Sequence, residues 1–177
     1  RAQLVRNAKG WGVDFEKMEK EGKLRLICAY PEYRGLEDHL LKIRDQILEF
    51  KPDRIAIDSL TALERIAGVR GFREFVIGLT SFVKKHEVLG LFTVTSPTLL
   101  GGTTITESHI STITDSIILL RYLELDCEMK RGITILKMRG SMHDKLIREF
   151  YIDQQGMHIG EPFTNIHGVL SDNPSKI

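Results

Sequence analysis

Short apolar strands that alternate with long amphipathic helices limit the fold of this chain more than any other feature. Residues 54–58 and 90–95 are short apolar runs, and residues 36–50 and 71–86 repeat their apolar side chains at the spacing of a helix that buries one face. Pro52 ends the first helical pattern. Strands and helices that alternate at these lengths predict βαβ units, and therefore an α/β fold with a largely parallel central sheet.

The patterns on both sides of this region are different. Residues 1–22 predict a helix that ends at Gly22, and residues 24–29 predict a short strand. Later in the chain, apolar runs separated by turn residues predict antiparallel strands over 116–123, 131–138 and 146–152. Because the chain has no internal repeat and no linker, we expect one domain over 1–170 and a loose polar tail over 171–177.

Composition excludes several classes of protein. The 177 residues fit one domain, and the net charge of +1 argues against a strongly basic nucleic-acid coat or an acidic tail protein. Two cysteines cannot build a disulfide-dense scaffold or a cysteine zinc site. No apolar run approaches the ~20 residues that span a bilayer, and the N-terminus has no secretory signal pattern. We therefore expect a cytoplasmic protein that does not enter the membrane.

Asp58 ends the first apolar strand, which makes it the leading candidate for a catalytic residue. The carboxyl edge of a parallel sheet is where open α/β sheets bind ligands. In nucleotide-binding ATPases this is the Walker B position, whose carboxylate orients Mg²⁺ or the water around it, so we expect Asp58 in the second shell of a metal rather than as a direct ligand. The alternative is that Asp58 or Ser59 caps a helix that begins near Leu60.

The phosphate loop that accompanies a Walker B strand has no counterpart in these residues. The pattern G-x-x-x-x-G-K-[ST] does not occur, and Gly101-Gly102-Thr103-Thr104 has no lysine. Two interpretations follow: the protein is not an ATPase, or the loop lies upstream of Arg1.

A basic segment over 128–148 is the second candidate. It carries six Lys or Arg against two acidic residues, a net charge of +4. Lys137 and Arg139 are two residues apart at the end of a predicted strand, so their side chains point to the same side. They precede a glycine turn and His143. This arrangement suits binding of a polyphosphate, including one that is held by a neighbouring subunit. The alternative is ordinary surface charge at the end of a strand.

Two further features carry weaker signals. Hydroxyl and carboxyl side chains alternate over 106–115, where a carboxylate could activate a hydroxyl or could simply serve a turn or cap. Trp11 could pack in the core or lie beside a nucleotide base.

Several exact strings in this chain are similar to those of the KaiC family of circadian clock proteins, in the C-terminal RecA-like repeat of its members. They are Trp11-Gly12, Ile55-Ala56-Ile57-Asp58-Ser59-Leu60, Ser108-His109-Ile110-Ser111-Thr112-Ile113-Thr114-Asp115, Lys137-Met138-Arg139-Gly140-Ser141 and His143-Asp144-Lys145. The resemblance covers essentially the whole chain. It implies a RecA-like P-loop NTPase fold with antiparallel C-terminal strands, whose phosphate loop and catalytic glutamates would lie just before Arg1.

The resemblance also implies an activity. Members are ATP- and Mg²⁺-dependent serine/threonine autokinases and ATPases that can return the phosphate to ADP, and they assemble as homohexameric rings with ATP between subunits. By this resemblance Asp58 would be the Walker B carboxylate, and Ser111 and Thr112 would accept phosphate from the ATP of the adjacent subunit. The resemblance also implies that partners of the KaiA and KaiB type regulate the protein.

Further roles come from the same resemblance. Residues that would reach the neighbour's ATP are Lys137, Arg139 and His143, with Arg131 and Lys145 close by. Trp11 would lie near the base. Residues near the phosphorylation sites would be Arg65, Thr106 and Glu107. The chain departs from the family in having Glu107 where Asp is common and Met142 where an aromatic is usual.

Two other functions stay open at the level of sequence. One is a RecA-like ATPase without kinase activity, for which the near-neutral charge disfavours handling of nucleic acid. The other is a ring or scaffold module without enzymatic activity.

Overall fold

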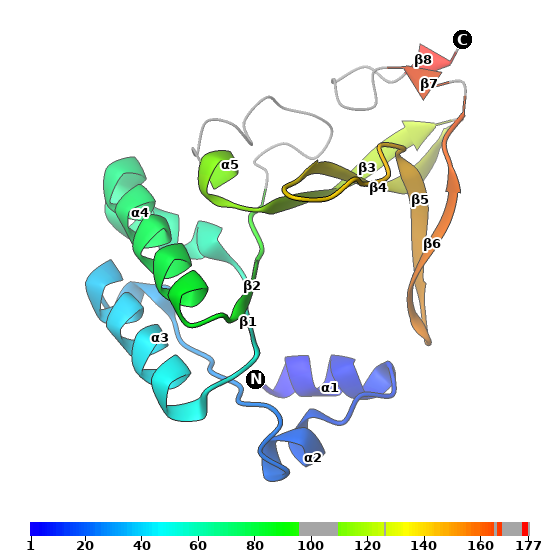
Figure 1. The fold of residues 1–177 in the computed structure, drawn as a ribbon. Helices are drawn as coiled ribbons and strands as arrows, with labels where there is room; N and C mark the ends of the chain where they lie inside the picture. The colour runs from blue at the N-terminus through cyan, green and yellow to red at the C-terminus, as the bar shows by residue number, and fades with distance from the viewer. Residues whose placement is uncertain (96–109, 126, 165, 168–174, 177) are drawn as a thin grey trace. The chain divides into compact units, whose positions relative to one another are not determined.

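The computed structural model describes residues 1–95, 110–125, 127–164, 166–167 and 175–176 (Figure 1). The described residues form two compact units. One unit contains residues 30–95 and 110–115, and the other contains residues 1–29 and the residues from 116 onward.

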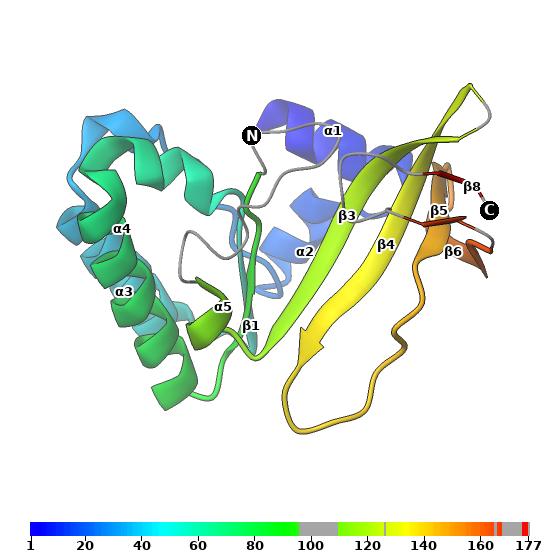
Figure 2. The same ribbon diagram turned by 90° about the horizontal axis from the view of Figure 1, so that it is seen from above.

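The unit that contains residues 30–95 is built on a short parallel sheet covered by two helices. Strands β1 (Arg54–Ile57) and β2 (Leu89–Phe92) pair in parallel, and helices α3 (Leu36–Phe50) and α4 (Leu60–Lys85) lie side by side next to them (Figures 1 and 2). This confirms the predicted α/β arrangement with parallel strands. A turn of 3-10 helix (Pro31–Tyr33) precedes α3.

The core of this unit comes from the apolar stripes of the two helices. Its fully buried members are Leu60, Val76 and Leu79, and Ile55 and Ile57 of β1 pack against the same cluster. Each fully buried side chain of this size contributes about 1.5–3 kcal/mol. The alternation of half-buried and exposed residues along β1 shows that one face of the sheet rests on this core.

Helix α4 begins earlier than the sequence pattern over 71–86 predicts. It starts at Leu60 and is interrupted at Gly68, whose φ of 66° favours glycine. The predicted helix is therefore the part of α4 that follows the interruption. Leu60 and Leu63 of the first part are buried in the same core, and their spacing is the signal that extends the helix back to Ser59.

The N-terminal segment corrects two predictions. Instead of one helix over 1–22 there are two, α1 (Ala2–Gly10) and α2 (Phe15–Lys20), because Gly12 takes a φ of 77° and Asp14 caps α2 by accepting a hydrogen bond from the N–H of Lys17. Residues 24–29 are not a strand: the N–H of Leu26 donates to a carboxylate oxygen of Glu19 at 3.1 Å instead of to a neighbouring strand.

The second unit contains a four-stranded antiparallel sheet. Its strands pair in the order β3 (Ser116–Leu125), β4 (Glu128–Met138), β5 (Arg148–Asp153) and β6 (Gly156–Pro162). Leu123 and Leu125 form a small core with Ile147 and Phe163. The antiparallel arrangement predicted for this part of the chain is confirmed.

The last described elements are two short strands, β7 (Ile166–His167) and β8 (Ser175–Lys176), which pair antiparallel. Strand β8 lies within the segment for which the sequence predicts a tail, and the boundaries 1–170 and 171–177 stay a prediction. Among the described residues, no helix combines the length and apolar character needed to cross a bilayer.

Candidate functional site

Asp58 lies immediately after β1, at the edge of the sheet where both parallel strands end. The register that pairs Ile57 with Phe92 brings the next residue of each strand, Asp58 and Thr93, to the same edge. The hydroxyl of Thr93 donates a hydrogen bond to Oδ1 of Asp58 at 2.6 Å. The side chain of Asp58 is exposed, so its carboxylate is both oriented and accessible.

Backbone hydrogen bonds hold Thr93 in this position. The N–H of Thr93 donates to the carbonyl of Ile57 at 3.1 Å, and its own carbonyl accepts from the N–H of Leu60 at 2.9 Å. One step further, the N–H of Thr95 donates to the hydroxyl of Thr61 at 2.9 Å. The ends of β1 and β2 and the start of α4 are therefore joined around the Asp58 carboxylate.

This geometry argues against the capping interpretation of Asp58. Ser59 occupies the N-cap position of α4 without a side-chain cap, and Asp58 accepts its hydrogen bond from Thr93. Asp58 is therefore not a helix cap. A role for Asp58 in the second shell of Mg²⁺ stays a prediction.

The predicted phosphate acceptors lie on helix α5 (Ile110–Ile113) in the same unit as Asp58. Thr112 is exposed, and Ile113 packs against the core formed by α3 and α4. Arg65 is an exposed residue of α4. The side chain of Ser111, together with Thr106 and Glu107, lies outside the described residues.

The basic candidates belong to the other unit, on β4 and the segment that follows it. Lys130 pairs with Glu128 and Glu149, and Arg148 pairs with Asp144 at 2.8 Å. These ion pairs show that part of the charge in 128–148 is ordinary surface pairing. Lys130 and Arg148 are the two cations of the segment that the sequence does not assign to a nucleotide.

The remaining cations lie at separate places. Lys137 is near the end of β4 and Arg139 follows it. Arg131 is six residues before Lys137 on the same strand, roughly 20 Å away at the rise of a strand, and its guanidinium lies over the ring of Tyr122 at 5.8 Å. The spacing would let Lys137 and Arg139 contact one group, and Arg131 lies too far along the strand to share it.

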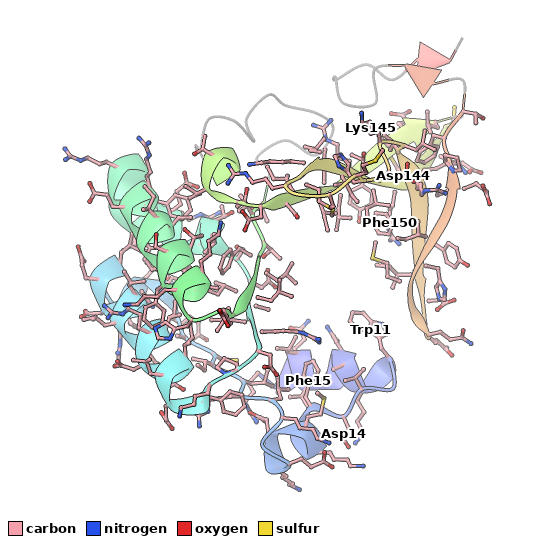
Figure 3. All side chains as sticks on the ribbon, in the orientation of Figure 1. Trp11, Asp14, Phe15, Asp144, Lys145 and Phe150 are labelled. Atoms are coloured by element: carbon pink, nitrogen blue, oxygen red, sulfur yellow. The ribbon has the colours of Figure 1, made fainter. Side chains whose placement is uncertain are left out.

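Asp144 and Lys145 lie in the segment between β4 and β5 (Figure 3). In this segment His143 is half-buried and Lys145 is exposed. Oδ1 of Asp144 accepts from the N–H of Leu146 at 2.9 Å and its Oδ2 accepts from Nε of Arg148 at 2.8 Å. These bonds, first the backbone one and then the one from Arg148, lower the pKa of the Asp144 carboxyl below its usual value. The carboxylate thus shapes the segment that carries His143 and Lys145.

Trp11 lies at the C-terminal cap of α1 with 52% of its surface exposed (Figure 3). The interpretation that Trp11 packs in the core of its unit is therefore wrong. A position beside a nucleotide base stays a prediction.

The sequence interpretation missed Thr93, the residue that orients Asp58. Its signal is present in the chain, because Thr93 is the first polar residue after the apolar part of the second parallel strand. It also missed Lys84, whose ammonium lies 2.8 Å from Asp115. Among the described residues, no group of three or more His, Cys, Asp or Glu side chains is placed to hold a metal ion.

A carboxylate at the carboxyl end of a parallel strand, with helices packed beside the sheet and antiparallel strands later in the chain, is the arrangement expected of a RecA-like ATPase domain. Comparison with known sequences identifies the family: the sequence model described as the KaiC ATPase matches residues 1–163. The chain therefore belongs to the KaiC family.

Relatives support this assignment. The circadian clock protein KaiC3 of Synechocystis sp. is 66% identical over 174 residues, which are 98% of this chain and 34% of the relative. The circadian clock oscillator proteins KaiC of Synechococcus elongatus and Thermosynechococcus vestitus are each 55% identical over all 177 residues, again 34% of their own lengths. The chain thus spans about a third of these relatives.

Replacement of Thr93 tests its role in orienting Asp58. We expect Thr93→Val to lower the rate of ATP hydrolysis by the full-length protein about ten- to hundredfold, because a hydrogen bond to a charged group contributes ~1.5–3 kcal/mol. Thr93→Ser keeps the hydroxyl and should retain most of the rate. Steady-state hydrolysis and thermal melting of both variants check this. Equal rates for the Val and Ser variants would contradict the assignment.

The ion-paired carboxylate of Asp144 predicts an acid-dependent segment. A carboxyl whose pKa falls on folding stabilises the fold above its unfolded pKa, and this contribution disappears as the pH falls through the folded pKa. We expect the amide NMR shift of Leu146 to titrate with a midpoint below 3.8, the ordinary value for Asp, and to stay constant in Asp144→Asn. Circular dichroism over the same range controls for unfolding. A midpoint at or above 3.8 contradicts the geometry.

Proposed function

We propose that this chain is part of an ATP-dependent serine/threonine autokinase that also hydrolyses ATP and can return phosphate to ADP. One observation carries the proposal: a single compact unit holds an oriented carboxylate, Asp58, directly after a parallel strand, and an exposed Thr112 on a helix that packs against the same core. A subunit with both a nucleotide site and an acceptor can serve a neighbour on each side, as a closed homohexameric ring allows.

The chemistry is transfer of the γ-phosphoryl group to a hydroxyl. The acceptor oxygen of Ser111 or Thr112 forms a bond to the γ-phosphorus, the bond to the β,γ-bridging oxygen breaks, and ADP leaves with that electron pair. The hydroxyl proton passes to a carboxylate base, for which the family resemblance implies a glutamate upstream of Arg1. Mg²⁺ bound with ATP would neutralise the phosphate charge, and Asp58 is the residue that would orient its water.

Cations from the neighbouring subunit complete the proposed site. Phosphoryl transfer depends on in-line placement and charge stabilisation more than on covalent chemistry. Lys137 and Arg139 lie close enough in sequence to act on one polyphosphate, and Asp144 holds the segment that carries His143 and Lys145. Arg131 would contact a different part of the nucleotide, and Trp11 would lie beside the base.

The names of the relatives support a role in a circadian clock. We also propose that the protein is cytoplasmic and is regulated by partners of the KaiA and KaiB type. Phosphates on Ser111 or Thr112 would each add about −1.5 to −2 charge, for which Arg65 is a candidate partner.

Incubation of the full-length protein with γ-labelled ATP tests the kinase proposal. We expect label on Ser111 and Thr112 and its loss in the Ser111→Ala/Thr112→Ala double variant and in Asp58→Asn. Ser81→Ala, which removes an exposed hydroxyl of α4, is the matched control and should keep the label. Phosphopeptide mapping reads out the sites.

The alternatives predict different results. Labelled free phosphate without labelled protein would mean an ATPase without kinase activity, which the family description alone also accommodates. Absence of both products in the full-length protein would leave a ring or scaffold module.

A further inference from the structure

An ion pair joins the segment just after helix α5 to helix α4. Lys84, in the last turn of α4, places its ammonium 2.8 Å from Oδ1 of Asp115. Both residues belong to the same compact unit, and α5 lies beside α4 (Figures 1 and 2). Asp115 is three residues beyond Thr112.

Contacts outside α5 must set its position. The helix has four residues, and a helix of one turn does not form stably by itself, because nucleation costs more than so few hydrogen bonds return. The structure shows two such anchors around Thr112: Ile113 packs against the core of α3 and α4, and Asp115 meets Lys84. The apolar contact of Ile113 sets how closely α5 packs against the core, while the ion pair of Asp115 fixes the end of the segment.

We infer that Lys84 is a positioning residue for phosphate acceptance: its ion pair with Asp115 holds the Ser111–Thr112 segment in the position from which the hydroxyls receive phosphate. This inference rests on the proposed autokinase function. Lys84 acts through Asp115 and touches neither ATP nor the reacting atoms in this account. The side chains are half exposed, at 50% and 57%, so the pair is sensitive to salt and its effect is modest.

The neighbouring residue Lys85 offers a matched control. It lies in the same last turn of α4 and is exposed, and no ion pair of Lys85 occurs among the described residues. Both lysines interact equally with the negative end of the helix dipole. A difference between variants at the two positions therefore reports on the pair with Asp115.

The test uses the full-length protein and measures the ratio of phosphate incorporated at Ser111 and Thr112 to phosphate released by hydrolysis. We expect Lys84→Met to lower this ratio about two- to fivefold, the range of an exposed ion pair, and Lys85→Met to leave it unchanged. The charge exchange Lys84→Glu with Asp115→Lys should restore at least half of the loss. At high salt the difference between Lys84→Met and the unmodified protein should shrink.

Each contrary result has one meaning. An unchanged ratio in Lys84→Met, a failure of the charge exchange to restore it, or a loss that persists at high salt would overturn the inference while leaving the autokinase in place. If the unmodified protein incorporates no phosphate at Ser111 or Thr112, the proposed function fails instead.

Discussion

The parallel register of β1 and β2 is the constraint on which the candidate site depends. Pairing Ile57 with Phe92 brings the next two residues, Asp58 and Thr93, to one edge, where a hydroxyl 2.6 Å away orients the carboxylate. The register is set by burial, because Ile55 and Ile57 must face the core of α3 and α4. A slip of one residue would expose both and separate Asp58 from Thr93.

The same core also supports the predicted acceptor. Ile113 connects α5 to the cluster that includes Leu79 and Val83, so the position of Thr112 depends on the packing that orients Asp58. The two features are held by different kinds of contact. The Asp58 carboxylate accepts a short hydrogen bond between strand ends, whereas the contacts of the acceptor segment include the apolar packing of Ile113 and the exposed ion pair of Asp115.

Local patterns predicted much of the fold. The apolar spacing in 36–50 is that of α3, and the runs around Ile55 and Leu91 are the parallel strands. The single N-terminal helix and the strand at 24–29 were wrong, because Gly12 and the bond from Leu26 to Glu19 depend on backbone geometry that periodicity does not report.

The site was predicted only in part, for a similar physical reason. Asp58 has a signal of its own, since a carboxylate after an apolar strand is readable along the chain. Thr93 and Lys84 act through partners 35 and 31 residues away, and a distant partner is visible only when the fold is known. The net charge of +4 over 128–148 can be counted from the sequence. The ion pairs of Lys130 and Arg148 within and around this segment can be seen only in the structure.

Transfer of phosphate between subunits is the central claim, and a mixture of two inactive proteins tests it most directly. In the account, one subunit contributes Asp58 to a site and its neighbour contributes Arg139 and the acceptors. Full-length Asp58→Asn and Arg139→Ala proteins, distinguished by mass and exchanged into common rings, should recover phosphorylation. The phosphate should appear on Ser111 or Thr112 of the Asp58→Asn subunits. No recovery, or phosphate confined to the Arg139→Ala subunits, would contradict the account.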